Sequence, residues 1–459
     1  MRAGSAIPLS TVSGQIWPAL PQAAGQTMLA AQFQLERSQW WTPELLAQRQ
    51  LEQLRSLAAF ALRQVPHYRE LITARLPEVA RDPQALTWEA FARWPILQKA
   101  DLREHGAALL ATALPQDHGG MSWNFTSGST GTPIRCALTM VGHFFRSALT
   151  LRNQIWHDLD FGLKYADIRP GASPGRSPGW GAATNSAFDS APSVHFAITA
   201  DIDAQLDWLL AEAPGYLHST ASNLRALVMR SRDTGRIPQG LDAVLSYAEN
   251  LPADLRTLVR EVWGTRLIDT YSCTETGPIA LQCPVYDHYH VQSEAVIAEV
   301  LRDDGSPCAP GEIGRVVITE LSNFGMPLIR YAISDYAELG APCDCGRGLP
   351  VLKRVMGRYR NMALDPDGRL FWPSFPVENW YHIAPLSQMQ MVQHTPVSIE
   401  VRYVMVRELD ATERAQFVAA FGPTMRYPFE YRFSRVPAIT HDVGQKFEEF
   451  ISLCLPAVP

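Results

Sequence analysis

The sequence has no surplus of basic residues. Its 40 Lys and Arg are outnumbered by 46 Asp and Glu, which gives a formal net charge of -6 and a pI of about 6.1. Proteins that bind DNA or RNA normally carry a basic patch that neutralises phosphates. We therefore expect no nucleic-acid partner.

Long apolar runs are also missing. No stretch approaches the roughly 18 consecutive apolar residues that span a bilayer, and residues 1–20 lack the continuous apolar segment of a signal peptide. These absences predict a cytoplasmic protein without a membrane partner. The seven cysteines are odd in number and scattered, which argues against a disulfide framework and favours reduced thiols or a metal site.

The length is too great for one compact core. A chain of 459 residues and 51.0 kDa predicts several folding units. Hydrophobic residues make up 46% and charged residues 19%, as in ordinary globular proteins. The 12 Trp and 18 Phe are enough to furnish both cores and an aromatic pocket.

Hydrophobic periodicity predicts an α/β core. Leu and Ala at three- and four-residue spacing over 42–75 indicate a helix that ends before Pro66 and a second helix after it. Beyond about residue 122, short strand-like and helical segments alternate, which favours a largely parallel sheet. The helices are expected at 206–211, 221–232 and 255–263, and the strands at 243–247 and 266–271.

The remaining segments predict a two-domain arrangement. Residues 169–186 are rich in Gly, Pro and Ser, which indicates a mobile loop. Residues 293–300 and 314–320 read as antiparallel strands around the turn at Gly305. After Arg358 a turn, a strand and a helix predict a small α+β lid. We expect a large N-terminal domain of several subdomains with parallel-rich sheets, residues 1–359, and a C-terminal lid domain, residues 360–459.

Residues 126–132 read Thr-Ser-Gly-Ser-Thr-Gly-Thr. Hydroxyl groups and backbone N–H groups in such a run can wrap polyphosphate oxygens, and the glycines let the backbone approach an anion closely. The alternative is a flexible Ser/Gly turn. It is not a Walker loop, because no Gly-Lys-Ser/Thr follows.

Two carboxylates follow predicted strands. Thr274 and Glu275 come after the strand at 266–271, at the kind of strand end where α/β sheets place ligands. Glu275 there suits Mg²⁺, which prefers oxygen ligands, and the alternative is a polar turn. Asp335 follows a strand that includes residues 328–331, where a carboxylate can accept two hydrogen bonds from ribose hydroxyls.

Cysteines and histidines suggest a second metal site. Cys343 and Cys345 can hold a metal from one tight loop, and Cys283 with His290 can supply two more ligands. Together they would form a closed structural zinc site. The alternative is four unrelated side chains, and His288 is a substitute ligand.

Three segments, taken in order, resemble a known family. Residues 126–133, 271–277 and 326–335 are similar to motifs of the adenylate-forming superfamily, which includes acyl-CoA synthetases, peptide-synthetase adenylation domains and luciferases. Within it the chain resembles the branch of phenylacetate-coenzyme A ligases and coenzyme F390 synthetases. Residues 65–68 and 94–103 also resemble the opening helices of that branch, so the resemblance covers nearly the whole chain.

The resemblance implies roles for individual residues. Thr274 would contact the α-phosphate, Glu275 would hold Mg²⁺, and a closing lid would bring Lys446 to the reacting carboxylate. Attack on an anionic phosphorus needs cations, which Mg²⁺ and Lys446 would supply; the alternative for Lys446 is a solvated lysine at a helix start. The other implied ATP contacts are Thr126, Ser127, Gly128, Ser129, Thr130 and Gly131 with the β- and γ-phosphates; Tyr247, Ala248, Glu249 and Tyr271 with adenine; and Asp335, near Arg358, with ribose.

Three positions depart from the family pattern. Ser334 replaces the usual Gly before the ribose-binding aspartate, Arg360 replaces an acidic hinge residue, and Ile134 displaces the basic residue after the phosphate loop. A non-acidic hinge puts in doubt the rotation of the lid into a second, thiol-accepting conformation.

The expected function is ATP- and Mg²⁺-dependent activation of an aromatic carboxylic acid to an acyl-adenylate, with release of pyrophosphate. Coenzyme A or another nucleophile would then receive the acyl group. Two alternatives remain open. The acceptor is an amine or other non-CoA group in secondary metabolism, as in activation of phenazine acids, or the chain is a degenerate ligand-binding protein. A homodimer is also left open.

Overall fold

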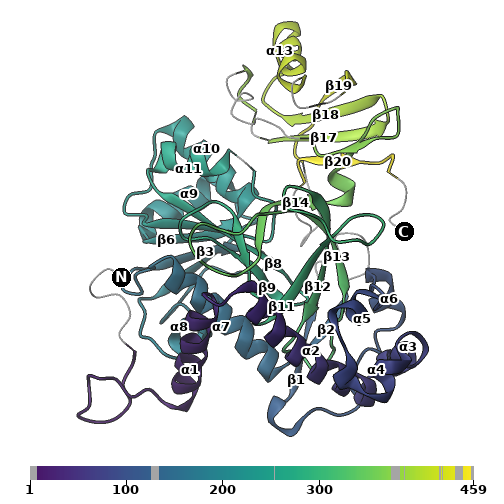
Figure 1. Cartoon of the computed structure of the whole chain (residues 1–459). Coiled ribbons are helices and arrows are strands. Elements are labelled where there is room, and N and C mark those ends of the chain that lie inside the picture. The colour runs from purple at the N-terminus through teal and green to yellow at the C-terminus, as the bar shows by residue number, and fades with distance from the viewer. Residues whose placement is uncertain are drawn as a thin grey trace.

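The computed structural model describes residues 8–125, 134–252, 254–373, 383–386, 388–422, 425, 427–439 and 448–455. An N-terminal layer of helices lies against a large sheet (Figure 1). The predicted break at Pro66 is confirmed, because that residue begins a new helix. The helices of this layer are α1 (Ala23–Ser38), α2 (Pro43–Gln64), α3 (Pro66–Arg75), α4 (Pro77–Arg81), α5 (Trp88–Ala92) and α6 (Lys99–Glu104).

One half of the large sheet is parallel, as predicted. Five strands run in the order β8-β7-β6-β3-β5 with parallel pairing, and β4 extends the edge antiparallel to β5. Three helices that follow these strands bury one face against Ala166, Leu217 and Val244. The strands are β3 (Tyr165–Arg169), β4 (Gly175–Ser177), β5 (Ser193–Ala197), β6 (Tyr216–Thr220), β7 (Ala243–Tyr247) and β8 (Arg266–Cys273); the helices are α9 (Ile202–Glu212), α10 (Ala221–Thr234) and α11 (Leu255–Trp263).

The other half of the sheet is antiparallel. It continues from β8 in the order β9-β10-β14-β13-β12-β11, so the antiparallel pair predicted around Gly305 is present. A separate hairpin, β1 (Met121–Phe125) with β2 (Arg135–Thr139), leads into α7 (Met140–Trp156). The six strands are β9 (Gly277–Gln282), β10 (Tyr289–Val291), β11 (Val296–Leu301), β12 (Ile313–Glu320), β13 (Tyr331–Leu339) and β14 (Val351–Arg358).

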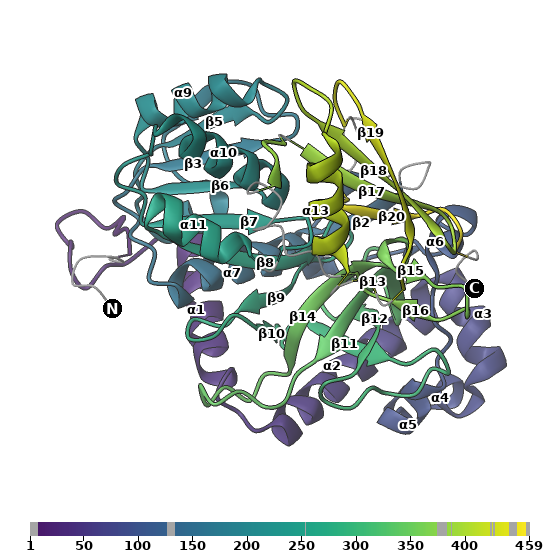
Figure 2. The same ribbon diagram turned by 90° about the horizontal axis from the view of Figure 1, so that it is seen from above.

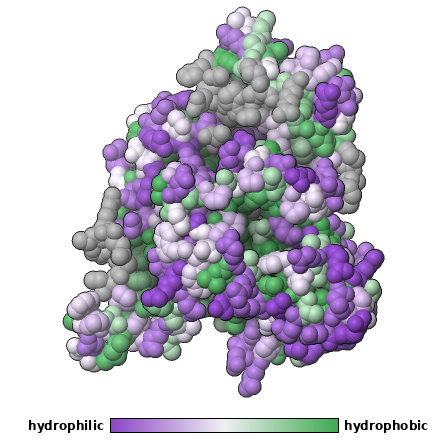
Figure 3. Space-filling view, viewed as in Figure 1, coloured by the Kyte–Doolittle hydropathy of each residue, from purple (hydrophilic) through white to green (hydrophobic). Residues whose placement is uncertain are grey.

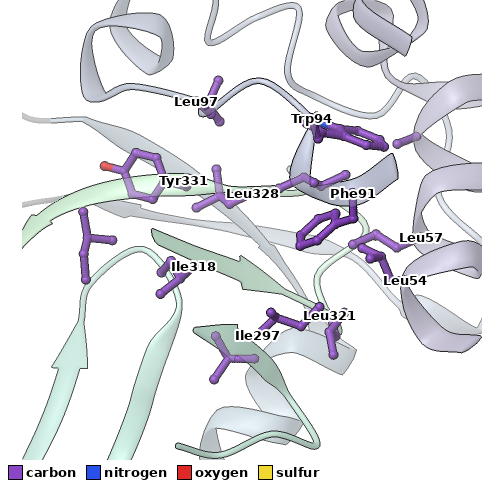
Figure 4. Packing of buried hydrophobic residues seen from close by; sticks show 14 of the residues in the cluster. Leu54, Leu57, Phe91, Trp94, Leu97, Ile297, Ile318, Leu321, Leu328 and Tyr331 are labelled. Carbon is purple, nitrogen blue, oxygen red and sulfur yellow. The ribbon is translucent and has the colours of Figure 1, made fainter. Parts of the chain in front are cut away.

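The helical layer and the antiparallel strands share one hydrophobic core (Figure 4). Leu54 and Leu57 of α2 pack with Phe91 and Trp94 over residues of β11, β12 and β13. Each such side chain stabilises the fold by about 1.5–3 kcal/mol when it is fully buried. Leu97 is tied to β13 through its backbone, donating to the carbonyl of Arg330 (2.9 Å) and accepting from Ala332 (2.9 Å). This core therefore fixes the start of α6 beside β13.

The segment predicted as a mobile loop, residues 169–186, instead contains β4 and α8 (Ala182–Asn185). Trp180 provides the physical reason. Its indole donates a hydrogen bond to the carbonyl of Leu163 (3.0 Å), and its ring packs edge-on against Phe161 and Tyr216. The packing of Trp180 therefore orders a segment whose Gly, Pro and Ser content predicted a mobile loop.

A separate small sheet follows β14, as the predicted α+β lid requires, and Figure 1 shows it above the large sheet with α13 outermost. Phe417 and Phe421 of that helix pack on Val401 and Tyr403 in a core of their own. The boundary between residues 359 and 360 stays a prediction. The elements are β15 (Ala363–Leu364), β16 (Leu370–Phe371), β17 (Gln388–Thr395), β18 (Ser398–Val404), α13 (Ala411–Phe421), β19 (Glu430–Arg435) and β20 (Phe450–Ser452).

The two views of the molecule place the lid over the end of the large sheet. In Figure 2, which looks from above, α13, β17, β18 and β20 lie to the right of β7 and β8 and above β13 in the view. In Figure 3 hydrophilic and hydrophobic residues are interspersed on the face shown. Among the described residues, none of the helices combines the length and apolar character needed to cross a membrane.

Candidate active site

Glu275 lies in the turn between β8 and β9, directly after a strand end as predicted. Thr274 is exposed there, whereas Glu275 is buried. Gly277, which closes the turn, has φ 82° and lies so close to Arg146 that an added Cβ would sit 2.7 Å from that side chain. The turn therefore needs glycine for both its conformation and its packing.

A buried tyrosine orients Glu275. The hydroxyl of Tyr331 donates a hydrogen bond to Glu275 Oε1 (3.1 Å). Burial, and then the negative charge of Glu275, raises the pKa of Tyr331 well above its usual value, so the phenol stays protonated and donates. Figure 4 shows the Tyr331 oxygen directed away from the apolar cluster on which its ring packs. The core thus holds the carboxylate in one orientation.

Asp335 is held in the same manner. Tyr271 donates to Asp335 Oδ2 (3.0 Å), and Arg358 Nε lies 3.9 Å from Oδ1. Burial, followed by the charge of Asp335, raises the pKa of Tyr271 well above its usual value. Asp335 does not follow a strand, as the sequence suggested, but lies inside β13 opposite Arg358 of β14. The strand begins later than predicted because Arg330 has φ 49° and turns the chain just before Tyr331.

Ser334 stands where the family pattern has glycine. Its φ is 70°, in the left-handed region that glycine adopts without strain. A side chain in that conformation costs about 1–2 kcal/mol. The backbone that presents Asp335 therefore has the geometry a glycine would give, despite the substitution.

Residues 247–249, expected near adenine, form the end of β7 and the turn after it. Ala248 has φ 67°, and Glu249 accepts hydrogen bonds from the backbone N–H (2.8 Å) and hydroxyl (3.0 Å) of Ser222 at the start of α10. Tyr247 is opposite Thr270 of β8. Because β7 is next to β8, this turn lies beside the strand that leads to Glu275.

Two cations near Glu275 were missed from the sequence. Arg146 of α7 donates to the backbone carbonyl oxygens of Thr274 (3.2 Å) and Glu275. Lys99, the first residue of α6, has its pKa lowered by burial, an effect opposed by the charges of Glu275 and Asp335. Lys99 falls in the segment 94–103 that resembled the family, but only the Leu97 bridge to β13 brings it to the site.

Several predicted site residues lie outside the described part of the chain. They are Thr126, Ser127, Gly128, Ser129, Thr130, Gly131 and Lys446. The strands that flank the first six are described and pair as far as Phe125 with Arg135. Their roles stay predictions.

Comparison with known proteins identifies the family. Residues 48–325 match the family described as AMP-binding enzyme. The chain belongs to this family. That result confirms the adenylate-forming enzyme class predicted from the three motifs.

Individual relatives are more distant. The chain is 27% identical to a phenylacetate-coenzyme A ligase of Thermus thermophilus over 336 residues, which covers 70% of this chain and 72% of that protein. It is 26% identical to a phenylacetate-coenzyme A ligase of Pseudomonas putida over 366 residues, covering 75% and 78%.

Solved structures show the same fold. The structure of 2-hydroxyisobutyryl-CoA ligase in the postadenylation state matches with a TM-score of 0.72 at 17% identity, over 91% of both chains. An anthranilate CoA ligase in complex with anthranoyl-AMP matches with a TM-score of 0.55 at 15% identity, over 73% of this chain and 68% of that one. These matches confirm the predicted α/β architecture with its small C-terminal region.

In this AMP-binding enzyme the unusual hinge residue has an acidic partner. Arg360 Nε donates to Glu448 Oε1 (3.0 Å), and Arg358 NH1 lies 4.0 Å from the same oxygen. Glu448 is partly buried, and it comes two residues after Lys446 in the sequence. Glu448 therefore lies beside the Arg358–Asp335 pair.

A cleft of ≈ 1380 Å³ opens between β12–β14 and the C-terminal region. Ser334 and Tyr336 line it from the large sheet, and Trp372 and Glu449 line it from the other side. Burial raises the pKa of Glu449. Basic side chains around the cleft are Arg256, Arg302, Arg315, Lys353 and Arg354.

The cysteines and histidines considered as metal ligands come together at the far end of β9 and β10. The donor atoms of Cys283, His288, His290 and Cys343 all lie within 4.8 Å of one another. Cys345 Sγ is 3.4 Å from His290 Nε2. Three of the four predicted ligands, Cys283, His290 and Cys343, thus come together, and the fourth place in the group is taken by the substitute ligand His288 and not by Cys345.

The donor set fits zinc. Two sulfurs and two imidazoles are a common ligand set for a closed structural site, in which tetrahedral geometry separates the donor atoms by roughly 3.3–3.8 Å. The two sulfurs, Cys283 Sγ and Cys343 Sγ, are 4.0 Å apart. His288 Nε2 is buried and has no hydrogen-bond partner among the described residues, as expected of an atom reserved for a metal.

Proposed function

We propose that this chain uses ATP and Mg²⁺ to convert an aromatic carboxylic acid to an acyl-adenylate, with release of pyrophosphate, and then transfers the acyl group to coenzyme A. The observation that carries the proposal is the pair of carboxylates Glu275 and Asp335, each held by the hydroxyl of a buried tyrosine. The two phenylacetate-coenzyme A ligases support the aromatic acid. A related ligase structure that contains both an acyl-AMP and CoA supports the acceptor.

Each residue of the candidate active site is assigned a role from its position. Glu275, oriented by Tyr331, would hold Mg²⁺, which when bound neutralises charge on the phosphates. Asp335 would accept the ribose hydroxyls, while Thr274 would bind the α-phosphate. Arg146 keeps the Thr274–Glu275 turn in place through the two backbone carbonyls. We assign Lys446 to the charge that builds on the reacting carboxylate and α-phosphate.

The cleft supports a phosphorylated acceptor. Its five basic side chains outnumber its three acidic ones, Asp287, Asp303 and Glu449, and suit the phosphates of coenzyme A, because Lys and Arg bind phosphate through charge-assisted hydrogen bonds. The alternative acceptor, an amine in secondary metabolism, would not need them. The Arg360–Glu448 pair replaces the usual hinge and does not by itself favour either acceptor.

The proposal is tested by a screen of aryl acids for pyrophosphate release, with coenzyme A, with hydroxylamine as a simple amine, and with neither. We expect release that depends on the acid in every case and a thioester product with coenzyme A. Products with amines alone would favour the second acceptor class. Background release with all acids would indicate a ligand-binding protein without turnover.

Asp335→Ala should weaken ATP binding by about 2–5 kcal/mol, because two hydrogen bonds from the ribose to a charged group are lost. The measurement is calorimetric titration with ATP in the absence of acid. Asp203→Ala is the matched control, since Asp203 of α9 pairs with Arg230 of α10 on the surface. Unaltered ATP affinity in Asp335→Ala would show that the ribose lies elsewhere.

We also propose that Cys283, His288, His290 and Cys343 hold a structural zinc ion. It would join the β9–β10 connection to the loop before β14, the strand that carries Arg358. Arg347 and Gly348 in that loop contact Gln39 at the end of α1. The ion would therefore stabilise the loop that precedes β14 and would take no part in the reaction.

Purified protein is expected to contain about one zinc per chain, and Cys343→Ala should lose the zinc and melt several degrees lower. The reason is that removal of one ligand opens a closed site. Elemental analysis and thermal unfolding measure the two effects. Cys308→Ala, a buried cysteine outside the cluster, should keep its zinc. Fully folded protein free of zinc would contradict the assignment.

A further inference from the structure

A row of polar side chains crosses the parallel strands β5, β3, β6 and β7. The last of these, β7, is next to β8, the strand that leads to the candidate active site. Asp167 of β3 is opposite His195 of β5 on one side and His218 of β6 on the other. Side chains of residues opposite each other in a sheet share one face. Tyr247 of β7 lies on the same face, since it is opposite Thr220, two residues after His218.

Asp167 is the buried centre of this row. His218 Nδ1 lies 3.1 Å from Oδ1, while Arg169 Nε and His195 Nδ1 lie 3.1 Å and 3.8 Å from Oδ2. Burial alone would raise the pKa of Asp167, but the hydrogen bond and charge of His218, with Arg169 and His195, bring it below its ordinary value. Asp167 is thus a carboxylate, which accepts from His218 Nδ1–H.

The tautomer of His218 follows from that bond. With the proton on Nδ1, the other ring nitrogen, Nε2, points away from Asp167 as an acceptor. Within the described part of the chain, Nε2 has no hydrogen-bond partner, and the side chain is 27% exposed. His195 differs, because its Nε2 lies 3.1 Å from Ser177 Oγ and 3.3 Å from Ser193 Oγ.

Tyr247 provides a flat wall beside His218. The two rings are stacked, with centroids 4.3 Å apart and planes at 22°. Tyr247 is opposite Thr270 of β8, four residues before Thr274 on the strand that leads to the turn, and His218 lies one strand farther away, on β6. An aromatic acid that reaches from the turn along this face of the sheet would pass Tyr247 before it meets His218.

We infer that His218, oriented by Asp167, is a specificity-determining residue that accepts a hydrogen bond at Nε2 from a hydroxyl group on the ring of the acid. The inference rests on the proposed function and narrows its substrate class to hydroxylated aryl acids. Tyr247 stacks on His218 and holds the imidazole in place. A site built to hydrogen-bond a hydroxyl discriminates against the analogue that lacks it, because its own polar atom is then left unpaired.

The test compares matched pairs of acids, phenylacetate with its 2-, 3- and 4-hydroxy derivatives and benzoate with its hydroxy derivatives. The wild-type enzyme should show a kcat/KM for pyrophosphate release about 10- to 100-fold higher for one hydroxylated isomer. His218→Phe should lose that preference, so that the ratio of kcat/KM for the hydroxylated acid to kcat/KM for the unsubstituted acid falls to about 1. His218→Gln, which retains an acceptor, should keep part of the preference, and His195→Gln should keep it fully.

The outcomes separate the two proposals. An active wild-type enzyme that is indifferent to the hydroxyl overturns this inference alone. So does a folded His218→Phe or His218→Gln variant that slows every acid by the same factor. A wild-type enzyme that activates none of the acids overturns the proposed function, and this inference with it.

Discussion

Glu275→Gln is expected to lower the rate of pyrophosphate release by at least about 100-fold, the equivalent of several kcal/mol of transition-state stabilisation by the metal. Gln is nearly isosteric and still accepts the hydrogen bond of Tyr331, so the turn keeps its shape. What is lost is the negative charge that a hard cation requires. ATP-dependent pyrophosphate release, measured over a range of Mg²⁺ concentrations, gives the rate and the Mg²⁺ dependence.

Two further variants bracket that result. Tyr331→Phe leaves the charge of Glu275 and removes only its orientation, so the expected loss is about 10-fold or more but smaller than that of Glu275→Gln. Glu299→Gln removes a partly buried glutamate paired with Arg330 on the opposite side of the core, and should cost stability without changing the Mg²⁺ dependence. A Glu275→Gln enzyme with normal rate and normal Mg²⁺ dependence would refute the metal-binding role.

Local patterns predicted much of the sheet. The strand at 243–247 and the helix at 255–263 have the bounds expected from the sequence, because a five-residue apolar run favours a buried strand and a three- to four-residue apolar period favours a helix. The break at Pro66 and the antiparallel pair around Gly305 depend equally on local chemistry. The order of three motifs was enough to predict the enzyme class.

Contacts between distant segments were not predictable in this way. Trp180 turns a Gly- and Pro-rich segment into ordered structure only because Phe161 and Tyr216 lie beside it. Lys99 reaches the site only through the backbone bridge of Leu97 to β13, more than 200 residues later in the chain. Such residues carry no local signal, since their roles are created by tertiary packing.

The hinge shows how a departure from a family pattern is compensated. A basic Arg360 in place of an acidic residue would add to the positive charge of Arg358. Glu448 lies against both guanidinium groups, with Arg360 Nε at 3.0 Å and Arg358 NH1 at 4.0 Å from its Oε1. The negative charge of Glu448 thus offsets both guanidinium groups.

Lys446→Ala is expected to reduce adenylation by about 1000-fold with little change in ATP affinity, because a preorganised cation at the developing charge acts mainly in the transition state. Lys446 itself lies outside the described residues. Glu448, two residues later, lies 4.0 Å from Arg358, and Arg358 lies 3.9 Å from Asp335. ATP–pyrophosphate exchange measures the rate, and calorimetric titration measures the affinity.

The other lysines provide a control variant for Lys446→Ala and an alternative candidate for the catalytic cation. Of the four lysines in the sequence, Lys164, just before β3, pairs with Glu212 at the end of α9, and Lys353 pairs with Glu338. Lys164→Ala should therefore leave adenylation unchanged. Lys99 is the remaining candidate, since it lies near enough to Glu275 and Asp335 for their charges to raise its pKa against the effect of burial. An unchanged rate in Lys446→Ala, with a large loss in Lys99→Ala, would transfer the catalytic cation from the lid to the start of α6.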